Sequence, residues 1–172
     1  LRGLGREDRL WRDLASPDLP QRIADAEPEE RVIPADEPRL DRIAHAFALV
    51  VDAKSTFTYH HSDRVADAAV AIGKTMGLSA GEQLRLRRAG LLHDIGKLAV
   101  PNRILDKPDR LDDAEWAIVK KHPFYTYEIL ERVPVFSEFA LDASAHHERM
   151  DGKGYHRGLT GNELSRDARI LA

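Results

Sequence analysis

The stretch SAGEQLRLRRAGLLHDIGK, residues 79–97, predicts a capped amphipathic helix that ends on a charged pair. Ser79 can cap the helix, and Glu82, three residues further on, completes a capping box. The glycine near the end of the stretch stops the helix. His93 and Asp94 fall in its last turn, directly after an apolar run. A charged aspartate in an apolar setting needs a partner, so the sequence predicts a polar site at this helix end.

Helical periodicity continues on both sides of this stretch. Apolar residues recur at three- and four-residue steps, and no segment alternates with a period of two for long enough to form a strand. We therefore expect an all-α domain with further helices over residues 40–51, 58–76, 112–119, 123–130 and 136–149. In the first two of these, the residues expected to face the core are Leu40, Ile43, Phe47, Val50 and Val51, then Val65, Ala68, Ala69, Ile72 and Met76.

The first part of the chain differs in composition. A short helix is predicted over residues 9–14. Five of the nine prolines then fall between residues 16 and 38 among many acidic residues, and proline interrupts any longer helix. We interpret residues 1–38 as an N-terminal arm or extended connector and residues 39–172 as one domain. Because the chain starts with a leucine and stops inside an apolar-periodic segment, we expect a piece of a longer protein.

Composition excludes several classes of protein. Of the 172 residues, 42% are hydrophobic and 32% charged, which is typical of a soluble globular domain with a real core. The net charge of −3 gives no broad basic field, so we expect no direct nucleic-acid binding by this domain. The absence of cysteine excludes disulfides and thiolate metal sites and suits a cytoplasmic protein. No apolar run is long enough for a membrane span.

Several histidines fall at helix ends or on inward faces. His61 lies four residues before Val65 on the apolar side of its helix, and His122 lies near the inward face of another. Adjacent residues on a helix diverge by about 100°, so a pair of neighbouring histidines can reach two points around a cavity. The full set is His61, His93, Asp94, His122, His146 and His147.

Taken singly, each of these histidines is most simply a hydrogen-bonded core or surface residue. Taken together they indicate metal, because burying several imidazoles with a carboxylate and no cation is unfavourable. Six potential ligands exceed the four of one tetrahedral ion, so we predict two metals. His45, His60 and His156 do not fit the apolar faces and are left outside the site.

Four motifs occur in order: His-Ser-Asp-Arg-Val from His61, His-Asp-Ile-Gly-Lys from His93, Lys-His-Pro around His122, and His-His-Glu-Arg-Met-Asp-Gly-Lys-Gly-Tyr from His146. Together they resemble the HD-GYP branch of the HD-domain phosphohydrolases, from about residue 40 to the end of the chain. The resemblance implies a helical bundle with two or three metal ions, commonly iron or manganese. It also implies hydrolysis of cyclic di-GMP to pGpG or GMP.

The resemblance implies a role for each matching residue. The metal ligands would be the six residues above, with Asp94 bridging two cations and a metal-bound hydroxide attacking phosphorus. Asp94 and Lys97 would be catalytic, although Lys97 also suits a plain helix C-terminus. The residues implied to bind or flank the substrate are Lys97, Arg149, Asp151, Gly152, Lys153, Gly154 and Tyr155. Solvated charges at Arg149 and Lys153, and glycines that permit positive φ in a tight turn, are the simpler alternatives.

The chain departs from the family at three places. The family's Gly-Tyr-Pro here has His156 in place of the proline. Trinuclear members carry a glutamate four residues before the first ligand histidine, where this chain has Phe57, so we favour two metals. A further ligand aspartate is expected just past Ala172. We therefore expect the chain as given to be a poor catalyst and an extended version to cleave phosphodiesters.

Other functions fit the same residues. The fold could serve as a ligand-sensing or interaction module without turnover. It could also be another HD-superfamily enzyme, acting on mononucleotides or activating oxygen at an iron pair. The expected partners are a cyclic dinucleotide and fused or separate signalling domains.

Overall fold

The computed structural model describes residues 16–26, 35–54 and 60–172. The chain divides into two compact units between Asp36 and Glu37, and each unit is described by itself. The helix expected over residues 9–14 and the position of Phe57 lie outside the described residues.

A helix forms within the segment that we expected to be extended. α2 spans Leu19–Ala26, so the expected extended connector is wrong for these eight residues. Pro20 falls in the first turn, where a helix needs no N–H from that residue, and the next proline comes only after the helix has ended. Gln21 donates a side-chain hydrogen bond to Asp25 one turn later (2.7 Å), which supports the helix.

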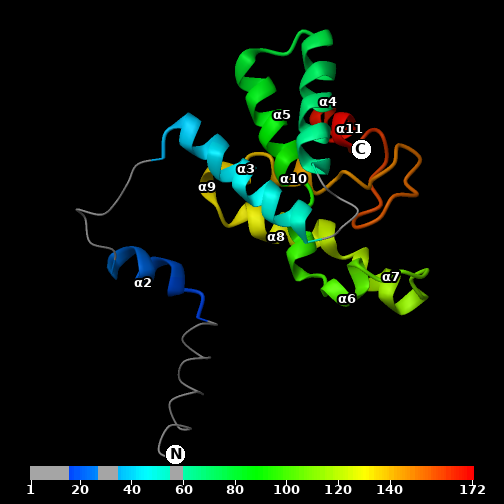
Figure 1. The fold of residues 1–172 in the computed structure, drawn as a ribbon. Helices are drawn as coiled ribbons and strands as arrows, with labels where there is room; N and C mark the ends of the chain where they lie inside the picture. Colours follow the sequence, from blue (N-terminus) through cyan, green and yellow to red (C-terminus); the bar gives the residue numbers. More distant parts are fainter. Residues whose placement is uncertain (1–15, 27–34, 55–59) are drawn as a thin grey trace, which may run out of the picture. The chain divides into compact units, whose positions relative to one another are not determined.

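The second unit is built from helices (Figure 1). Its described residues contain no strand, only an isolated bridge between Asp151 and Thr160, so the predicted all-α fold is confirmed. The elements in order are α3 (Glu37–Ala53), α4 (His61–Thr75), α5 (Ala80–Leu92), the 3₁₀ helix η3 (Ile95–Ala99), α6 (Asn102–Leu105), α7 (Asp113–Val119), α8 (His122–Glu131), α9 (Pro134–Ser137), α10 (Ala140–Ala143) and α11 (Arg166–Leu171).

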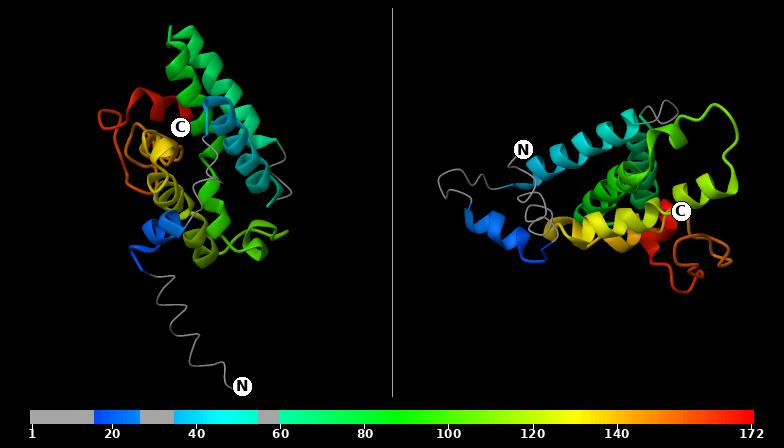
Figure 2. Two further views of the ribbon diagram at one scale, coloured as in Figure 1. Left: turned by 90° about the vertical axis from the view of Figure 1, so that its left-hand side faces the viewer. Right: turned by 90° about the horizontal axis from the view of Figure 1, so that it is seen from below.

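The core lies where α3, α4 and α5 meet. α4 and α5 pack along each other, and α10 packs on α5 and α8 (Figures 1 and 2). The buried guanidinium of Arg88 ties α5 to α3 through Asp41 (2.6 Å) and Glu37 (2.7 Å). The capping box of Ser79 and Glu82 begins α5 as the sequence predicted. These contacts fix the direction in which the end of α5 points.

Several large apolar residues that we expected in the core lie outside it. Phe47 and Val50 on α3, Ile72 on α4 and Met76 just after it are all at least 43% exposed. The buried face of these two helices consists largely of small residues, namely Ala44, Ala48, Ala66, Ala69 and Gly73. Small side chains let helix backbones approach closely. The face that each of these helices buries is therefore the one with small residues, next to the face with the bulkiest residues.

Two predicted helices end earlier than expected. α5 stops at Leu92, so His93 and Asp94 lie in the turn before η3. The helix expected over residues 136–149 is divided into α9 and α10, with Phe139 between them at φ −118° and ψ 10°. Turns follow α10 and carry the His-His pair. Each helix end leaves backbone carbonyls without an intrahelical donor, and those carbonyls are available to nearby side chains.

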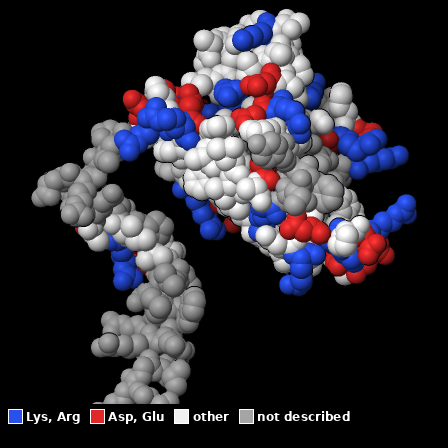
Figure 3. Space-filling view, in the orientation of Figure 1, with Lys and Arg blue, Asp and Glu red and all other residues white. Residues whose placement is uncertain are grey.

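The surface of the second unit carries charges of both signs. On the face drawn in Figure 3, lysines and arginines lie among aspartates and glutamates. This distribution agrees with the small net charge of −3. Within the described part of the chain, no helix is both long and apolar enough to cross a membrane.

η3 packs against the start of α8 through Gly96. A Cβ added there would lie 1.9 Å from the His122 carbonyl oxygen and 2.5 Å from the Thr126 nitrogen. The Gly96 N–H donates to the Thr126 hydroxyl (3.0 Å), which in turn donates to the His93 carbonyl (2.8 Å). This contact holds the His-Asp turn against α8.

We predict that Gly96→Ala lowers the free energy of unfolding by about 3 kcal/mol, because the methyl group overlaps backbone atoms. Gly81→Ala is the matched control, since no described atom lies within 4 Å of the Cβ position there. In a helix this control should be neutral or stabilise by up to about 1 kcal/mol. Urea unfolding of both variants gives the two values, and equal stabilities would contradict the prediction.

Candidate metal centre

The six predicted ligands come together at one end of the bundle. The first residues of α4 and α8 supply His61 and His122, and the turns after α5 and α10 supply the other four. Their ligand atoms form two groups, each with its members within 4.8 Å of one another. The first triad is His61, His93 and Asp94, and the second triad is His122, His146 and His147.

One oxygen of Asp94 faces the first triad. Its Oδ2 atom lies 3.2 Å from Nε2 of His93 and 3.8 Å from Nε2 of His61. The ammonium of Lys97 also lies 2.6 Å from this oxygen. The carboxylate is 4% exposed, so these groups are its main electrostatic partners on this side.

The other oxygen of Asp94 faces the second triad. Its Oδ1 atom lies 3.3 Å from Nε2 of His122 and 3.6 Å from Nε2 of His146. A single carboxylate therefore lies between two sets of imidazoles, with one oxygen directed to each set.

Helix ends orient three of the imidazoles in the same way. Each Nδ1 atom lies 2.7 Å from the carbonyl oxygen three residues earlier, His93 on Gly90, His122 on Val119 and His146 on Ala143. A carbonyl oxygen only accepts, so each Nδ1 donates its proton and each Nε2 lone pair faces Asp94. These carbonyls belong to the last turns of α5, α7 and α10, whose negative ends favour a cation nearby.

This arrangement fits divalent cations. The Nε2 atoms of His122 and His146 lie 3.0 Å apart although both rings already donate from Nδ1. Oδ1 of Asp94 is buried and has no hydrogen-bond partner among the described residues. A cation satisfies the two lone pairs and the carboxylate together, and the Nδ1 anchors are the usual support of a ligand histidine.

Burial sets the protonation of the cluster. It lowers the pKa of His146 to about 4 and that of His147 to about 3. Both imidazoles are therefore neutral near pH 7, the state that binds a metal. Burial alone would raise the pKa of Asp94, but the surrounding imidazoles, His93 first among them, outweigh it and hold that pKa well below its usual range. The carboxylate is thus ionised.

The predicted substrate loop lies partly in the site. The ring of Tyr155 stacks on that of His147, with centroids 4.6 Å apart. Gly152 has a φ of 71°, so it serves the tight turn that we expected. Gly154 does not have a positive φ, so it does not serve the tight turn. A Cβ there would lie 2.4 Å from the Glu148 Cα, so this glycine allows the loop to approach the protein's own backbone.

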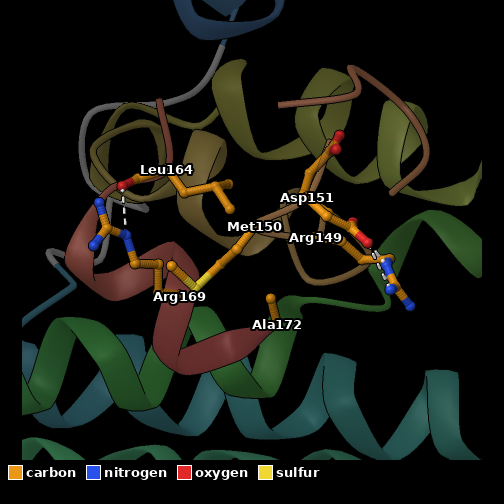
Figure 4. A pocket seen from close by; sticks show the side chains of 7 residues that line it. Arg149, Met150, Asp151, Leu164, Arg169 and Ala172 are labelled. Carbon is orange, nitrogen blue, oxygen red and sulfur yellow. Dashed lines mark hydrogen bonds and ion pairs between the residues drawn. The ribbon is translucent and has the colours of Figure 1, made fainter. Parts of the chain in front are cut away.

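The charged residues of the loop lie at the surface. Arg149 donates two hydrogen bonds to Asp151, at 3.0 and 2.8 Å, and the Arg149 side chain is 64% exposed. Arg149 and Asp151 also line a cavity of about 470 Å³ with Glu148, Met150, Leu164, Arg169 and Ala172 (Figure 4). None of the six predicted metal ligands lines this cavity, so it is separate from the two triads.

Glu148 holds the loop in place, a role that the sequence analysis did not assign to it. Its carboxylate is buried and accepts hydrogen bonds from three successive backbone N–H groups, those of Arg157 (2.7 Å), Gly158 (3.2 Å) and Leu159 (2.9 Å). It therefore anchors the far end of the loop that brings Tyr155 onto His147. Because the partners of Glu148 are backbone N–H groups, no pattern of side chains in the sequence indicates this role.

The remaining histidines lie outside both triads. His45 and His60 contact the carboxylate of Asp63 at 3.3 and 3.4 Å. His156 lies against Phe124 with a ring separation of 5.9 Å, and its φ is 97°. Proline is fixed near −65°, so the loop adopts a backbone conformation at His156 that the family's proline cannot take.

Comparison with known proteins identifies the family. The HD domain family matches residues 46–172, which is most of the chain. The chain belongs to the HD-domain family. It is 45% identical over 163 residues to the 3′3′-cGAMP-specific phosphodiesterase 3 of Vibrio cholerae, across 95% of this chain and 35% of that protein. The family resemblance that the motifs carried is confirmed.

Two further comparisons agree with this assignment. Over 135 residues the chain is 36% identical to the cyclic di-GMP phosphodiesterase response regulator RpfG of Xanthomonas campestris, across 77% of this chain and 35% of that protein. A crystal structure of a V. cholerae cyclic GMP-AMP specific phosphodiesterase gives a TM-score of 0.54 at 40% identity, across 98% of this chain and 38% of that one. The chain spans about a third of the length of the curated relatives it matches.

We predict that Mn²⁺ or Fe²⁺ added to chelated protein raises its melting temperature. Mass action gives about 3–4 kcal/mol at several hundred to a thousand times Kd. His146→Ala removes a predicted ligand of the second triad and should lose most of this gain. The control is His45→Ala, outside both triads, which should keep it. Equal shifts in both variants, or no shift in the parent protein at saturating metal, would count against the site.

Proposed function

We propose that this domain is a metal-dependent phosphodiesterase that hydrolyses cyclic dinucleotides. The observation that carries the proposal is the position of Asp94, whose two oxygens face two different triads. A carboxylate shared between two sets of imidazoles suits a pair of divalent cations placed to act on one phosphodiester. The names of the relatives, which act on cyclic dinucleotides, support the same class of reaction.

We propose two divalent ions, iron or manganese, held by the first and second triads with Asp94 shared. Imidazole nitrogens with a carboxylate and no thiolate suit these ions. Bound cations of this kind lower the pKa of water toward 7 and neutralise the charge on phosphate oxygens.

The chain's own residues would position the substrate. The His61 side chain is 38% exposed, so the first triad is open to solvent. Lys97 lies on the side of this triad, and its ammonium can bind a phosphate oxygen and offset negative charge in the transition state. Burial raises the pKa of Tyr155, so its phenol stays protonated and can donate a hydrogen bond.

The relatives favour one substrate over another. The sequence alone led us to expect cyclic di-GMP, on which RpfG acts. The relative with 45% identity is specific for 3′3′-cGAMP, and it is more similar in sequence to this chain than RpfG is. We therefore place 3′3′-cGAMP first and cyclic di-GMP second. Hydrolysis of the first phosphodiester bond opens the ring to a linear dinucleotide, and hydrolysis of the second gives mononucleotides.

We predict that the full-length protein, loaded with manganese or iron, cleaves 3′3′-cGAMP with a higher kcat/KM than cyclic di-GMP. Asp94→Ala should lower kcat/KM by about a thousandfold or more, because both triads lose their shared ligand and the reacting groups lose their placement. Asp67→Ala is the matched control. It removes an exposed carboxylate paired with Arg87 and should leave kcat/KM within about twofold.

Each outcome of this assay decides between functions. Metal binding without cleavage of either dinucleotide would overturn the enzymatic proposal and favour the ligand-sensing module. Cleavage of mononucleotides alone would favour another HD-superfamily reaction. Equal kcat/KM values for the two dinucleotides would keep the phosphodiesterase and overturn the preference for 3′3′-cGAMP.

A further inference from the structure

A row of aromatic rings leads from the second triad to the surface. Tyr155 stacks on His147 with its plane inclined by only 24°. Trp116 meets Tyr155 edge to face, with centroids 6.2 Å apart and planes at 70°. Trp116 itself is 43% exposed. The row therefore begins at a predicted metal ligand and ends in an indole that is open to solvent.

The contact between Trp116 and Tyr155 leaves an indole face available. An edge-to-face pair covers at most one face of one ring, so Trp116 keeps a face that Tyr155 does not touch. Tryptophan is highly buried on average, so this exposed ring beside a polar site suits an aromatic ligand.

The helix that carries Trp116 packs on a small separate core. This core consists of Val100, Ile104 and Val119, of which α6 and α7, labelled in Figure 1, supply the last two. A capping box of Asp112 and Glu115 begins α7, and Lys107 pairs with Glu115 at 2.6 Å. The indole is thus presented by a preorganised helix, which lowers the entropic cost of binding a ligand.

We propose that Trp116 is a substrate-binding residue that stacks on a purine base of the substrate. This inference rests on the proposed function, because a phosphodiester at the triads places its own nucleoside next to the ring row. A purine offers a flat π-face whatever its exocyclic groups, so the indole selects for a base and not for a particular purine. Loss of a stacked aromatic side chain lowers affinity by about 5- to 150-fold per base.

Fluorescence tests the contact directly. The chain has two tryptophans, Trp11 and Trp116, so Trp11→Phe leaves Trp116 as the single emitter. We expect the manganese-loaded variant to lose fluorescence on titration with the bis-phosphorothioate analogue of 3′3′-cGAMP, which resists hydrolysis. Inorganic phosphate, which has no base, should leave the emission unchanged. Unchanged emission at a dinucleotide concentration that calorimetry shows to be saturating would overturn the proposal.

Kinetics provide an independent test. Trp116→Ala should raise KM for 3′3′-cGAMP about tenfold, and Trp116→Phe should recover most of the loss because a benzene ring still stacks. Ile118→Ala on the same helix, at a residue that is 36% exposed, is the control and should keep KM. A KM within twofold of the parent in Trp116→Ala, or a phenylalanine variant no better than alanine, would overturn the proposal.

These experiments distinguish failure of the proposed phosphodiesterase function from failure of the stacking role of Trp116. Dinucleotide that is bound with quenching but never cleaved overturns the proposed function and supports the stacking role. Dinucleotide that is cleaved without quenching or a KM effect supports the function and overturns the role of Trp116. A protein that neither binds nor cleaves the dinucleotide overturns both.

Discussion

The structure depends on one buried carboxylate kept ionised inside the bundle. Asp94 lies among four imidazoles and one ammonium, at a point where α4, α8 and the turns after α5 and α10 meet. A buried carboxylate surrounded by neutral imidazoles is unfavourable without further positive charge. Lys97 supplies part of that charge, and the cations that we propose supply the rest. The fold and the proposed chemistry therefore both require positive charge beside the Asp94 carboxylate.

The ends of helices set the geometry of the site. Three histidines donate from Nδ1 to carbonyls in the last turns of three different helices, which fixes both the tautomer and the direction of each ring. Glu148 also fixes the neighbouring loop, because its carboxylate accepts hydrogen bonds from three backbone N–H groups. A site built from helix termini leaves little freedom to its side chains, which suits the placement that catalysis needs.

The sequence predicted the longer helices α3, α4, α5 and α8 and the set of residues that come together, because both depend on patterns within a few residues. The capping box at Ser79 followed from spacing alone, whereas the box of Asp112 and Glu115 emerged only in the structure. The face that each helix buries was harder to predict, as Phe47 shows, because the face depends on a partner elsewhere in the chain. The break at Phe139 and the backbone contact at Gly154 likewise arise from tertiary packing.

Two cations that share Asp94 are the arrangement on which the proposed chemistry rests. Anomalous diffraction at the manganese edge, from crystals grown with Mn²⁺, tests it most directly. We predict two anomalous peaks beside the Asp94 carboxylate, one bonded to the first triad and the other to the second. A single peak, or peaks bonded to neither triad, would contradict the shared site.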